Sequence, residues 1–479
     1  MKKIAIKAGL ALSCGFTLFS CETIVRNQIS KSVIKDIEEK NYPFPYHNFN
    51  TRGYEALIGN AVPMTKPYLN EELLNRIQAE INKKYSFPIS AARKGILSDV
   101  EIVDYMYDIG ILDEIKISKN VATALIDKQE AESYILSGNK QNKVSFSFDA
   151  PDKPVVYRAE FEPISSVLIS FPIYYPLEWK TQAQLIKEVS ESAQALVLVP
   201  NHYWQQGIVM YLKKLGIPLN NVKFIHLNTD DVWTRDYGPT TVFSGKKQKP
   251  VLLWNHYYQE YYPYQKADAD AGISLGAALN LPVHRLPLII EGGNMLTDGA
   301  GTMVMFSSAY YTNPEVDSVK LKRIVSDYFG CNKLVLFPPL KGELTGHIDM
   351  IVKFTSKDTV IVTKSKLDYK WYADFEKIAN TLSKMTSSTG KRFTVLRIEM
   401  PETENSDETF YSYINSLIVN DKVVVPMFSN AKADKIAMAT YKKIFPNKKV
   451  VGIYYDRYPV GSVHCQTKDI PVLKTDLRN

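Results

Sequence analysis

The sequence predicts an α/β protein built from small repeated modules and preceded by a mostly helical region. Short β-branched runs alternate with amphipathic helices from residue 151 onward, a pattern typical of sheets covered by helices. The hydrophobic fraction of 45% and the charged fraction of 23% are those of an ordinary globular protein. With 479 residues, the chain is long enough for one large domain and an additional region.

Strands are expected where β-branched and other apolar residues form short runs. These runs are residues 166–171, 195–199, 223–227, 251–254, 302–306, 333–337, 360–363, 417–419 and 423–425. Helices are expected where apolar residues recur every three or four positions, at residues 181–194, 318–329, 370–385 and 431–445. Asn420-Asp421 predicts a hairpin turn. The similarity between these units in sequence is too weak to define repeats.

Residues 21–150 are expected to form the mostly helical region. Asn70 can cap a helix that carries Leu74, Ile77 and Ile81 on one face. This region holds no chemical motif, so a packing or spacer role is the simpler interpretation. Two prolines at residues 150–154 interrupt regular structure, and the α/β domain is expected to extend from 151 to 479.

Residues 1–20 are interpreted as a secretory signal of the lipoprotein type. Three lysines precede an apolar run at residues 8–19, and this run is too short to span a bilayer. The Leu-Phe-Ser that precedes Cys21 resembles a bacterial lipobox. We therefore expect Cys21 to carry lipid and to anchor the exported protein in the bacterial cell envelope. Secretion without lipid is the alternative.

The charge and the cysteines restrict the function further. The net charge is +7, and loss of residues 1–20 removes three lysines and no acid, which leaves +4. The sequence has no cluster of Lys and Arg of the kind that binds nucleic acid. The mature chain would keep Cys21, Cys331 and Cys465, which is no disulfide framework, so a free cysteine is a candidate for chemistry.

Two polar clusters follow apolar strands in the first half of the α/β region. The stretch WTRDYGP, with Trp233 and Asp236, suggests a loop at the end of a strand, where sites are often built. A salt-bridged surface turn is the alternative. Glu291 opens the stretch EGGN, and DGAG follows at residues 298–301. Its glycines suit a tight hairpin, and its spacing is not that of a phosphate loop.

Two further clusters carry the reactive side chains. His347 and Asp349 stand two positions apart in GHID, so on a strand they would project from the same face. A hydrogen-bonded structural histidine is the alternative. Near the C-terminus, His464 precedes Cys465 in VHCQT. In an extended segment these neighbours would point to opposite faces, so His347 is the better expected partner of the thiol. A small buried hydrophobic cysteine is the alternative.

Taken together, these groups meet the chemical requirements of a guanidinium substrate. A guanidinium stays cationic at any accessible pH, so its site needs carboxylates directed at its N–H groups. Its central carbon is a poor electrophile and needs a strong nucleophile and a proton donor for the departing nitrogen. Asp236, Glu291, His347, Asp349 and Cys465 supply this set. A metal site would need more ligands, and no HxxxH or CxxC spacing supplies them; the resemblance to a known family described next implies that neither a metal nor an organic cofactor is needed.

These motifs resemble the agmatine deiminase and bacterial-type peptidylarginine deiminase family. That family belongs to the guanidine-modifying pentein superfamily, whose fold is a five-bladed α/β propeller. The resemblance extends over residues 156–471 and rests on motifs in the family's order: RAEFEP, WTRDYGP, EGGN with DGAG, TGHID, the YINS stretch at 413–416, and VHCQT.

The resemblance implies a role for each reactive residue. Asp236 and Asp349 would hold the guanidinium nitrogens, and Glu291 would support that contact. His347 would act as general acid and base. Cys465 would attack the guanidinium carbon, release ammonia and leave a thiouronium adduct that water hydrolyses.

The resemblance also implies substrate-binding residues and a substrate class. Trp233 and Asn415 would line the pocket, and the substrate would be agmatine or a peptidyl-arginine. Related secreted enzymes have arginines that hold a C-terminal carboxylate, whereas residues 254–264 of this chain contain tyrosines and no arginine. Lys266 is the nearest cation. We therefore expect no strict need for a free carboxylate beside the arginine.

Three other interpretations use the same residues differently. An amidinotransferase of the same superfamily would pass the amidino group to an amine. A catalytically silent, lipid-anchored protein would use the acidic residues to bind cations, although binding alone needs no thiol. A papain-like protease fits least, because its cysteine lies near the mature N-terminus.

The lipid anchor leads to a prediction that is independent of the chemistry. Mass spectrometry of the native protein should show cleavage before Cys21 and an added acyl-glyceryl mass on that residue. A Cys21→Ser variant should lose this modification and leave the membrane fraction. An unmodified mature chain released into the medium would contradict the anchor.

Overall fold

The structure is a computed structural model. It describes residues 145–171, 179–199, 205, 208–209, 211–213, 215–227, 229, 231–256, 265–401, 410–455 and 461–471. The predicted signal, Cys21 and the predicted helical region lie outside the described residues. The segments Tyr134–Phe171, Lys180–Val199 and Ile217–Asn479 form one compact unit, which contains the α/β fold.

The described strands form five sheets that share one pattern. Strand β9 (Leu296–Thr297) pairs antiparallel with β10 (Thr302–Phe306), helix α15 (Ser318–Phe329) follows, and β11 (Lys333–Phe337) then pairs parallel with β10. A right-handed crossover through a helix is the usual way to join two parallel strands. Each module is therefore an antiparallel pair, a helix and a parallel strand.

The same order occurs in three further modules. These are β6 (Thr240–Ser244), β7 (Lys249–His256), α13 (Lys266–Leu279) and β8 (Val283–Ile289); β12 (Val352–Ser356), β13 (Thr359–Lys364), α16 (Tyr372–Lys384) and β14 (Thr394–Glu399); and β15 (Leu417–Val419), β16 (Lys422–Met427), α17 (Ala431–Ile444) and β17 (Lys449–Tyr454). In each, the first two strands are antiparallel and the last two are parallel.

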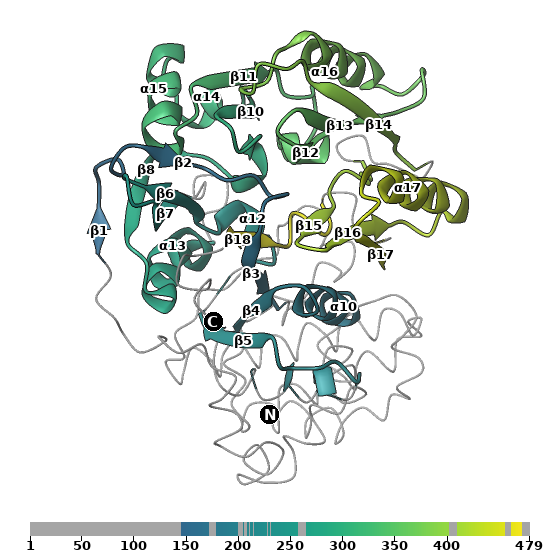
Figure 1. Ribbon diagram of the computed structural model, residues 1–479, viewed down its shortest axis with the longest axis horizontal. Coiled ribbons are helices and arrows are strands. Elements are labelled where there is room, and N and C mark those ends of the chain that lie inside the picture. Colours follow the sequence, from purple (N-terminus) through teal and green to yellow (C-terminus); the bar gives the residue numbers. More distant parts are fainter. Residues whose placement is uncertain are drawn as a thin grey trace, which may run out of the picture. The chain divides into compact units, whose positions relative to one another are not determined.

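The remaining module is assembled from both ends of the α/β region. Strand β18 (Lys468–Pro471) pairs antiparallel with β3 (Ile164–Ser170), and α10 (Trp179–Ser190) leads to β4 (Gln194–Val199), which is parallel to β3. Strand β5 (Val222–His226) extends this sheet. In Figure 1 the five modules lie around a common centre, with their helices on the outside. Pairing of β18 with β3 closes this ring.

Two short strands extend the sheet of β6, β7 and β8. Strand β1 (Phe146–Ser147) pairs parallel with β8, and β2 (Val155–Val156) pairs antiparallel with β6. The proline-containing stretch at 150–154 lies between them. Pairing with this sheet therefore begins before the expected boundary at residue 151.

Local sequence explains how the helices begin and end. Asp317 caps α15, because its carboxylate accepts a hydrogen bond from the backbone N–H of Lys320 at 2.7 Å. Gly330 ends the helix with φ of +67°, a conformation that favours glycine. Between these ends, Leu321 and Val325 lie on the buried face and pack into the core with strands of neighbouring sheets.

Most of the expected elements are present with small shifts at their ends. The runs at 302–306, 333–337 and 417–419 and the helix at 318–329 match the structure residue for residue. The expected helix at 181–194 is wrong at its end, because α10 stops at Ser190 and Gln194 begins β4. Helix α13 was not expected, since its small residues form no strong apolar stripe. Asn420 adopts φ of +48° in the β15–β16 hairpin, as predicted.

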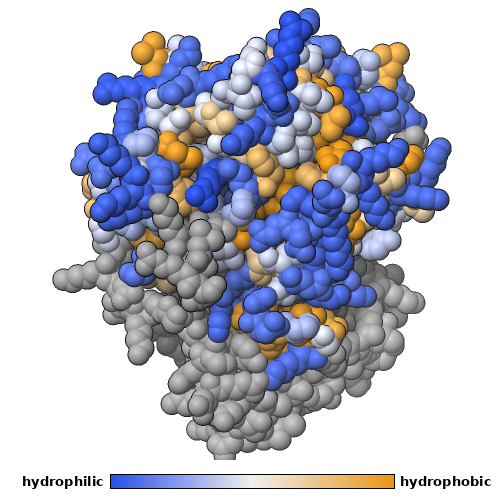
Figure 2. All heavy atoms as spheres, in the orientation of Figure 1, coloured by the Kyte–Doolittle hydropathy of each residue, from blue (hydrophilic) through white to orange (hydrophobic). Residues whose placement is uncertain are grey.

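On the face shown in Figure 2, the described residues are mainly hydrophilic. In Figure 2, polar side chains cover the outer parts of the modules, and hydrophobic residues gather toward the middle of this face. Most apolar side chains of the strands are fully buried. Within the described part of the chain, every helix is too short or too polar to cross a membrane.

Gly330 and Gly342 have similar φ angles, but an added methyl group is expected to affect stability differently at the two positions. At Gly330, a Cβ atom would lie 1.8 Å from the backbone oxygen of Val155, whereas at Gly342, with φ of +75°, nothing lies within 4 Å. Gly342→Ala should therefore cost about 1 kcal/mol of backbone strain. Gly330→Ala must also displace β2, and should cost about 3 kcal/mol or more. Urea unfolding of both variants tests this difference, and equal losses would contradict it.

Candidate active site

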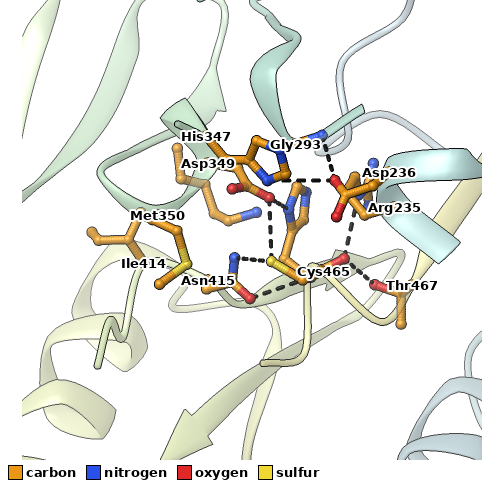
Figure 3. Close-up of polar contacts among 12 residues, drawn as sticks. Arg235, Asp236, Gly293, His347, Asp349, Met350, Ile414, Asn415, Cys465 and Thr467 are labelled. Carbon is orange, nitrogen blue, oxygen red and sulfur yellow. Dashed lines mark hydrogen bonds and ion pairs between the residues drawn. The ribbon is translucent and has the colours of Figure 1, made fainter. Parts of the chain in front are cut away.

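The predicted site residues lie on the connections between modules. Each connection runs from the last strand of one module to the first strand of the next. They contain α12 (Thr234–Tyr237) before β6, η2 (Gly292–Asn294) before β9, η3 (Ile348–Met350) before β12, residues 410–416 before β15, and residues 461–467 before β18. The ring therefore brings together residues that are far apart in the sequence (Figure 3).

Cys465 is buried and held by an amide. Its side chain is 2% exposed, and Asn415 Nδ2 donates a hydrogen bond to Sγ at 3.0 Å. Asn415 Oδ1 accepts hydrogen bonds from the backbone N–H groups of Ser462 and Cys465 at 3.0 and 3.2 Å. The sequence placed Asn415 among substrate-binding residues, but its contacts are with the thiol and the turn that carries the thiol.

Trp233 lies beside the thiol, close to Gly461. A Cβ atom on Gly461 would be 3.0 Å from Cys465 Sγ and 3.1 Å from Trp233 Cζ3. A side chain at this position would therefore push the ring and the sulfur apart. Trp233 is partly buried and packs against the core cluster that contains Cys465.

Asp349 connects the thiol to an imidazole. Its Oδ2 atom lies 3.8 Å from Cys465 Sγ and 2.6 Å from His464 Nδ1. Its Oδ1 atom is buried and has no hydrogen-bond partner among the described residues. A buried carboxylate oxygen without a partner is costly, so Oδ1 is available for a donor supplied by a ligand.

The expected direction of His464 was wrong. Residues 463–466 form a turn and not an extended segment, so neighbouring side chains are not restricted to opposite faces. His464 does not contact the thiol directly, but it contacts Asp349, which does. His464 is therefore linked to the Cys465 thiol through Asp349, a connection that the sequence did not predict.

The strand expected at GHID was also wrong. His347 precedes the short helix η3, and Asp349 lies within that helix. His347 Nε2 lies 2.5 Å from Glu291 Oε2, and Nδ1 lies 3.5 Å from Asp236 Oδ1. His347 and Asp349 still belong to the same cluster, because the turn directs both toward it (Figure 3).

The pKa values of Asp236 and His347 are both strongly raised. Burial raises the pKa of Asp236 to about 7, against the attraction of His347. Burial lowers the pKa of His347, but the carboxylates of Asp236 and Glu291 outweigh burial and raise it to about 10. His347 is therefore an imidazolium at neutral pH. Gly293 N–H donates to Asp236 Oδ1 at 3.0 Å and fixes that carboxylate.

The pKa values of the Cys465 thiol and of the Asp349 carboxyl group shift in opposite directions. Burial raises the pKa of Cys465 well above its ordinary value, and the charges of Asp349 and Asp236 raise it further. Burial also raises the pKa of Asp349, but the hydrogen bond from His464 and its charge bring that pKa below the usual value. Without a ligand, the site thus contains a neutral thiol beside an ionised carboxylate.

Sequence reasoning missed the residues behind this cluster. Glu160 Oε2 lies 2.5 Å from His464 Nε2, and Arg235 NH1 lies 2.7 Å from Asp469 Oδ1. Asn255 Nδ2 donates to the backbone oxygen of Asp236 at 2.7 Å. Glu160 and Arg235 stand inside the RAEFEP and WTRDYGP motifs, which was the available signal. Arg235 and Asp236 are also buried, which excludes the surface-turn interpretation.

The tyrosine stretch at 257–264 and the side chain of Lys266, on which the substrate expectation rests, lie outside the described residues. Across the described segments, no three His, Cys, Asp or Glu side chains form a group suited to hold a metal ion.

Comparison with known families identifies this arrangement. Residues 156–471 match the family model described as Porphyromonas-type peptidyl-arginine deiminase. The chain belongs to this family. The match extends from β2 to β18 and includes every connection that carries a site residue.

Individual relatives are distant. A Selenomonas ruminantium protein named "Putative agmatine deiminase" is 26% identical over 363 residues, which cover 66% of this chain and 95% of the relative. Among solved structures, an agmatine deiminase of Enterococcus faecalis has a TM-score of 0.60 at 20% identity, covering 66% of this chain and 96% of that one. A C. jejuni agmatine deiminase with substrate bound has a TM-score of 0.57 at 20% identity, with the same coverage. The mixed α/β fold thus matches pentein-family structures.

The Asn415–Cys465 contact predicts a shift in thiol reactivity. In an Asn415→Asp variant, Oδ1 can still accept hydrogen bonds from the turn, but the donor to Sγ is lost and a negative charge is added. The pKa of the Cys465 thiol should rise, and iodoacetamide should label it about tenfold more slowly at a fixed alkaline pH. Mass spectrometry of the Cys465 peptide over a pH series measures this.

A matched control is available in the same turn. Ser462→Ala removes hydrogen bonds to Asn415 but leaves the Nδ2 donor to the sulfur in place. It should label nearly as fast as the wild type. Equal labelling of the wild type and Asn415→Asp would show that the amide does not tune the thiol.

Proposed function

We propose that this protein is a deiminase that hydrolyses a guanidinium group to a ureido group and ammonia through a covalent adduct on Cys465. We further propose that residues 151–479 form the five-bladed α/β propeller typical of the pentein superfamily, closed by β18 and β3. The observation that carries the function is the pair formed by the buried Cys465 thiol and the buried Asp349 carboxylate, whose Oδ1 has no hydrogen-bond partner among the described residues.

The charges of the site favour a cationic ligand. Asp236, Glu291 and Asp349 supply three acidic side chains, and His347 is in ion-pair contact with the first two. A guanidinium has five or more N–H donors in a planar arrangement that matches carboxylates. Its donors can reach Asp349 Oδ1, which has no partner among the described residues. A bound cation also offsets the carboxylates that raise the thiol pKa, so binding promotes thiolate formation.

In the first half-reaction, the thiolate of Cys465 attacks the guanidinium carbon and forms a C–S bond. The adduct is tetrahedral and uncharged at carbon. The His347 imidazolium donates its proton to one terminal nitrogen, the C–N bond breaks and ammonia leaves. Charge balances, because a thiolate, a guanidinium and an imidazolium become a thiouronium cation, ammonia and neutral His347.

In the second half-reaction, neutral His347 removes a proton from water. The hydroxide forms a C–O bond with the thiouronium carbon, and the C–S bond then breaks to restore the thiolate. The ureido product loses one proton, which balances the conversion of ammonia to ammonium. Glu291 lies 2.5 Å from His347 Nε2 and fixes the orientation of the ring through both steps.

The substrate class we propose is agmatine or a peptidyl-arginine, with no strict need for a free carboxylate beside the arginine. Family membership and the likeness to agmatine deiminases support the guanidino class. The absence of arginine from the sequence stretch at 254–264 supports the relaxed requirement, because tyrosine cannot form the bidentate contact that arginine makes with a carboxylate.

Two other functions make different predictions from the same cluster. An amidinotransferase would need an acceptor amine, and would release no ammonia when an amine is absent. A silent binding protein would bind cations and form no adduct. The buried thiol beside Asp349, in the cluster that also contains His347, favours covalent chemistry over both simple binding and structural packing.

The central test compares the two described cysteines. Wild-type protein should release ammonia and a ureido product from at least one guanidino compound without an added amine. Cys465→Ala should lower turnover by about 10⁴-fold or more, because the nucleophile is lost. Cys331→Ala should retain turnover, since Cys331 is a core residue whose pKa burial raises to about 12. Loss of activity only in Cys331→Ala would refute the assignment.

A set of four compounds distinguishes agmatine from peptidyl-arginine substrates and tests the need for a free carboxylate. It contains agmatine, free arginine, an internal arginyl peptide and a C-terminal arginyl peptide. We expect values of kcat/KM for the internal and C-terminal peptides within about tenfold of each other. A preference above about a hundredfold for the C-terminal peptide, nearly 3 kcal/mol, would mean that a cation holds the carboxylate.

A further inference from the structure

His464 lies between two buried carboxylates. Its Nδ1 is 2.6 Å from Asp349 Oδ2, and its Nε2 is 2.5 Å from Glu160 Oε2. The ring is 1% exposed and so is the Asp349 side chain. The Nδ1 contact with Asp349 is a hydrogen bond, and the Glu160 carboxylate lies at ion-pair distance from the other ring nitrogen. The two carboxylates therefore hold the ring from both of its nitrogens.

Glu160 is itself held in place from several directions. Its Oε1 atom accepts hydrogen bonds from Lys353 Nζ at 2.9 Å and from the backbone N–H of Ile418 at 2.7 Å. Arg235 NH2 approaches Oε2 at 3.7 Å. One connection, through Arg235, and two strands, β12 and β15, thus fix the carboxylate that faces His464. The ring has little freedom to turn away from Asp349.

The two aspartates of the site differ in this support. Asp236 has a backbone N–H and His347 as partners, and burial raises its pKa to about 7. Asp349 is equally enclosed, yet His464 brings its pKa below the usual value despite burial. His464 also occupies Oδ2, which leaves Oδ1 without a partner among the described residues. Asp349 thus has a hydrogen-bonded imidazole at 2.6 Å, whereas the imidazole nearest to Asp236 lies at 3.5 Å and also contacts Glu291.

We propose that His464, backed by Glu160, is a positioning residue that keeps Asp349 oriented for capture of the cationic group. Neither side chain needs to touch the ligand. The Glu160–His464 pair acts through Asp349 Oδ2 and determines which oxygen faces the thiol site. This inference rests on the proposed function for its substrate class, but the arrangement of the three side chains is independent of turnover.

Two substitutions separate the two contacts of the ring. In His464→Asn, the amide nitrogen stands near the position of Nδ1 and can still donate to Asp349. In His464→Gln, the amide nitrogen stands near the position of Nε2 and can donate to Glu160 but not to Asp349. Both replace the buried ring with a neutral amide, so a purely structural role predicts similar losses in the two variants.

The positioning role predicts an unequal effect on catalysis. For the best substrate of the wild type, His464→Gln should lower kcat/KM about tenfold more than His464→Asn, chiefly through a higher KM. Thermal unfolding measured beside the kinetics shows whether both variants are folded. Equal losses, or a more active Gln variant, would overturn the proposal.

A second readout needs no turnover. Cys465 is alkylated in parallel by chloroacetamidine, which is cationic, and by iodoacetamide, which is neutral. The ratio of the two rates reports cation capture, because thiol reactivity is common to both reagents. His464→Gln should lower this ratio about tenfold relative to His464→Asn. An equal ratio in the two folded variants would overturn the proposal.

The two readouts also distinguish this inference from the proposed function. If wild-type protein releases no ammonia from any guanidino compound, the proposed function fails. The labelling ratio can still separate the Asn and Gln variants in that case, and the role of His464 would then concern cation binding. If wild-type protein is active but the variants do not differ, only the positioning role fails.

Discussion

The antiparallel pairing of β18 with β3 is the constraint on which the site depends. Asp469 pairs with Val167 and Lys468 with Leu168, so the last described strand joins the sheet that the chain began about 300 residues earlier. Cys465 lies immediately before β18, and Arg235 N–H donates to its backbone oxygen at 3.1 Å. Arg235 also pairs with Asp469. The thiol is thus placed by strand pairing and a buried ion pair.

Repetition of one module explains how the other residues converge. Each connection before a module's first strand ends near the centre of the ring, so each can supply a side chain to the same site (Figure 1). Asp236, His347 and Asn415 come from three such connections, and the short helices α12 and η3 direct the first two inward. Side chains that are more than two hundred positions apart therefore need no long loops to meet.

Sequence patterns predicted the chemical groups better than their orientation. Cys465, His347 and the acids were recognisable because a guanidinium needs those residue types, and strands such as β10 follow from dense apolar runs. Side-chain direction was misjudged at GHID and VHCQT, because alternation holds only for extended backbone and both segments are turns. Glu160 was missed as a partner of His464 because no local pattern links residues that meet only when the ring closes.

Burial raises the free energy of the charged groups in the site as long as no cation is bound. The thiol pKa is raised by burial and by Asp349 and Asp236, and burial opposes ionisation of each acid. Raised pKa values for Asp236 and His347 mean that both groups favour the folded state at low pH, and that this stability is lost as pH rises through about 7 and about 10. A guanidinium bound as we propose would act in the opposite direction, because it would favour the ionised carboxylates and the thiolate. On that proposal, ligand binding, folding stability and thiolate formation are coupled through the same few charges.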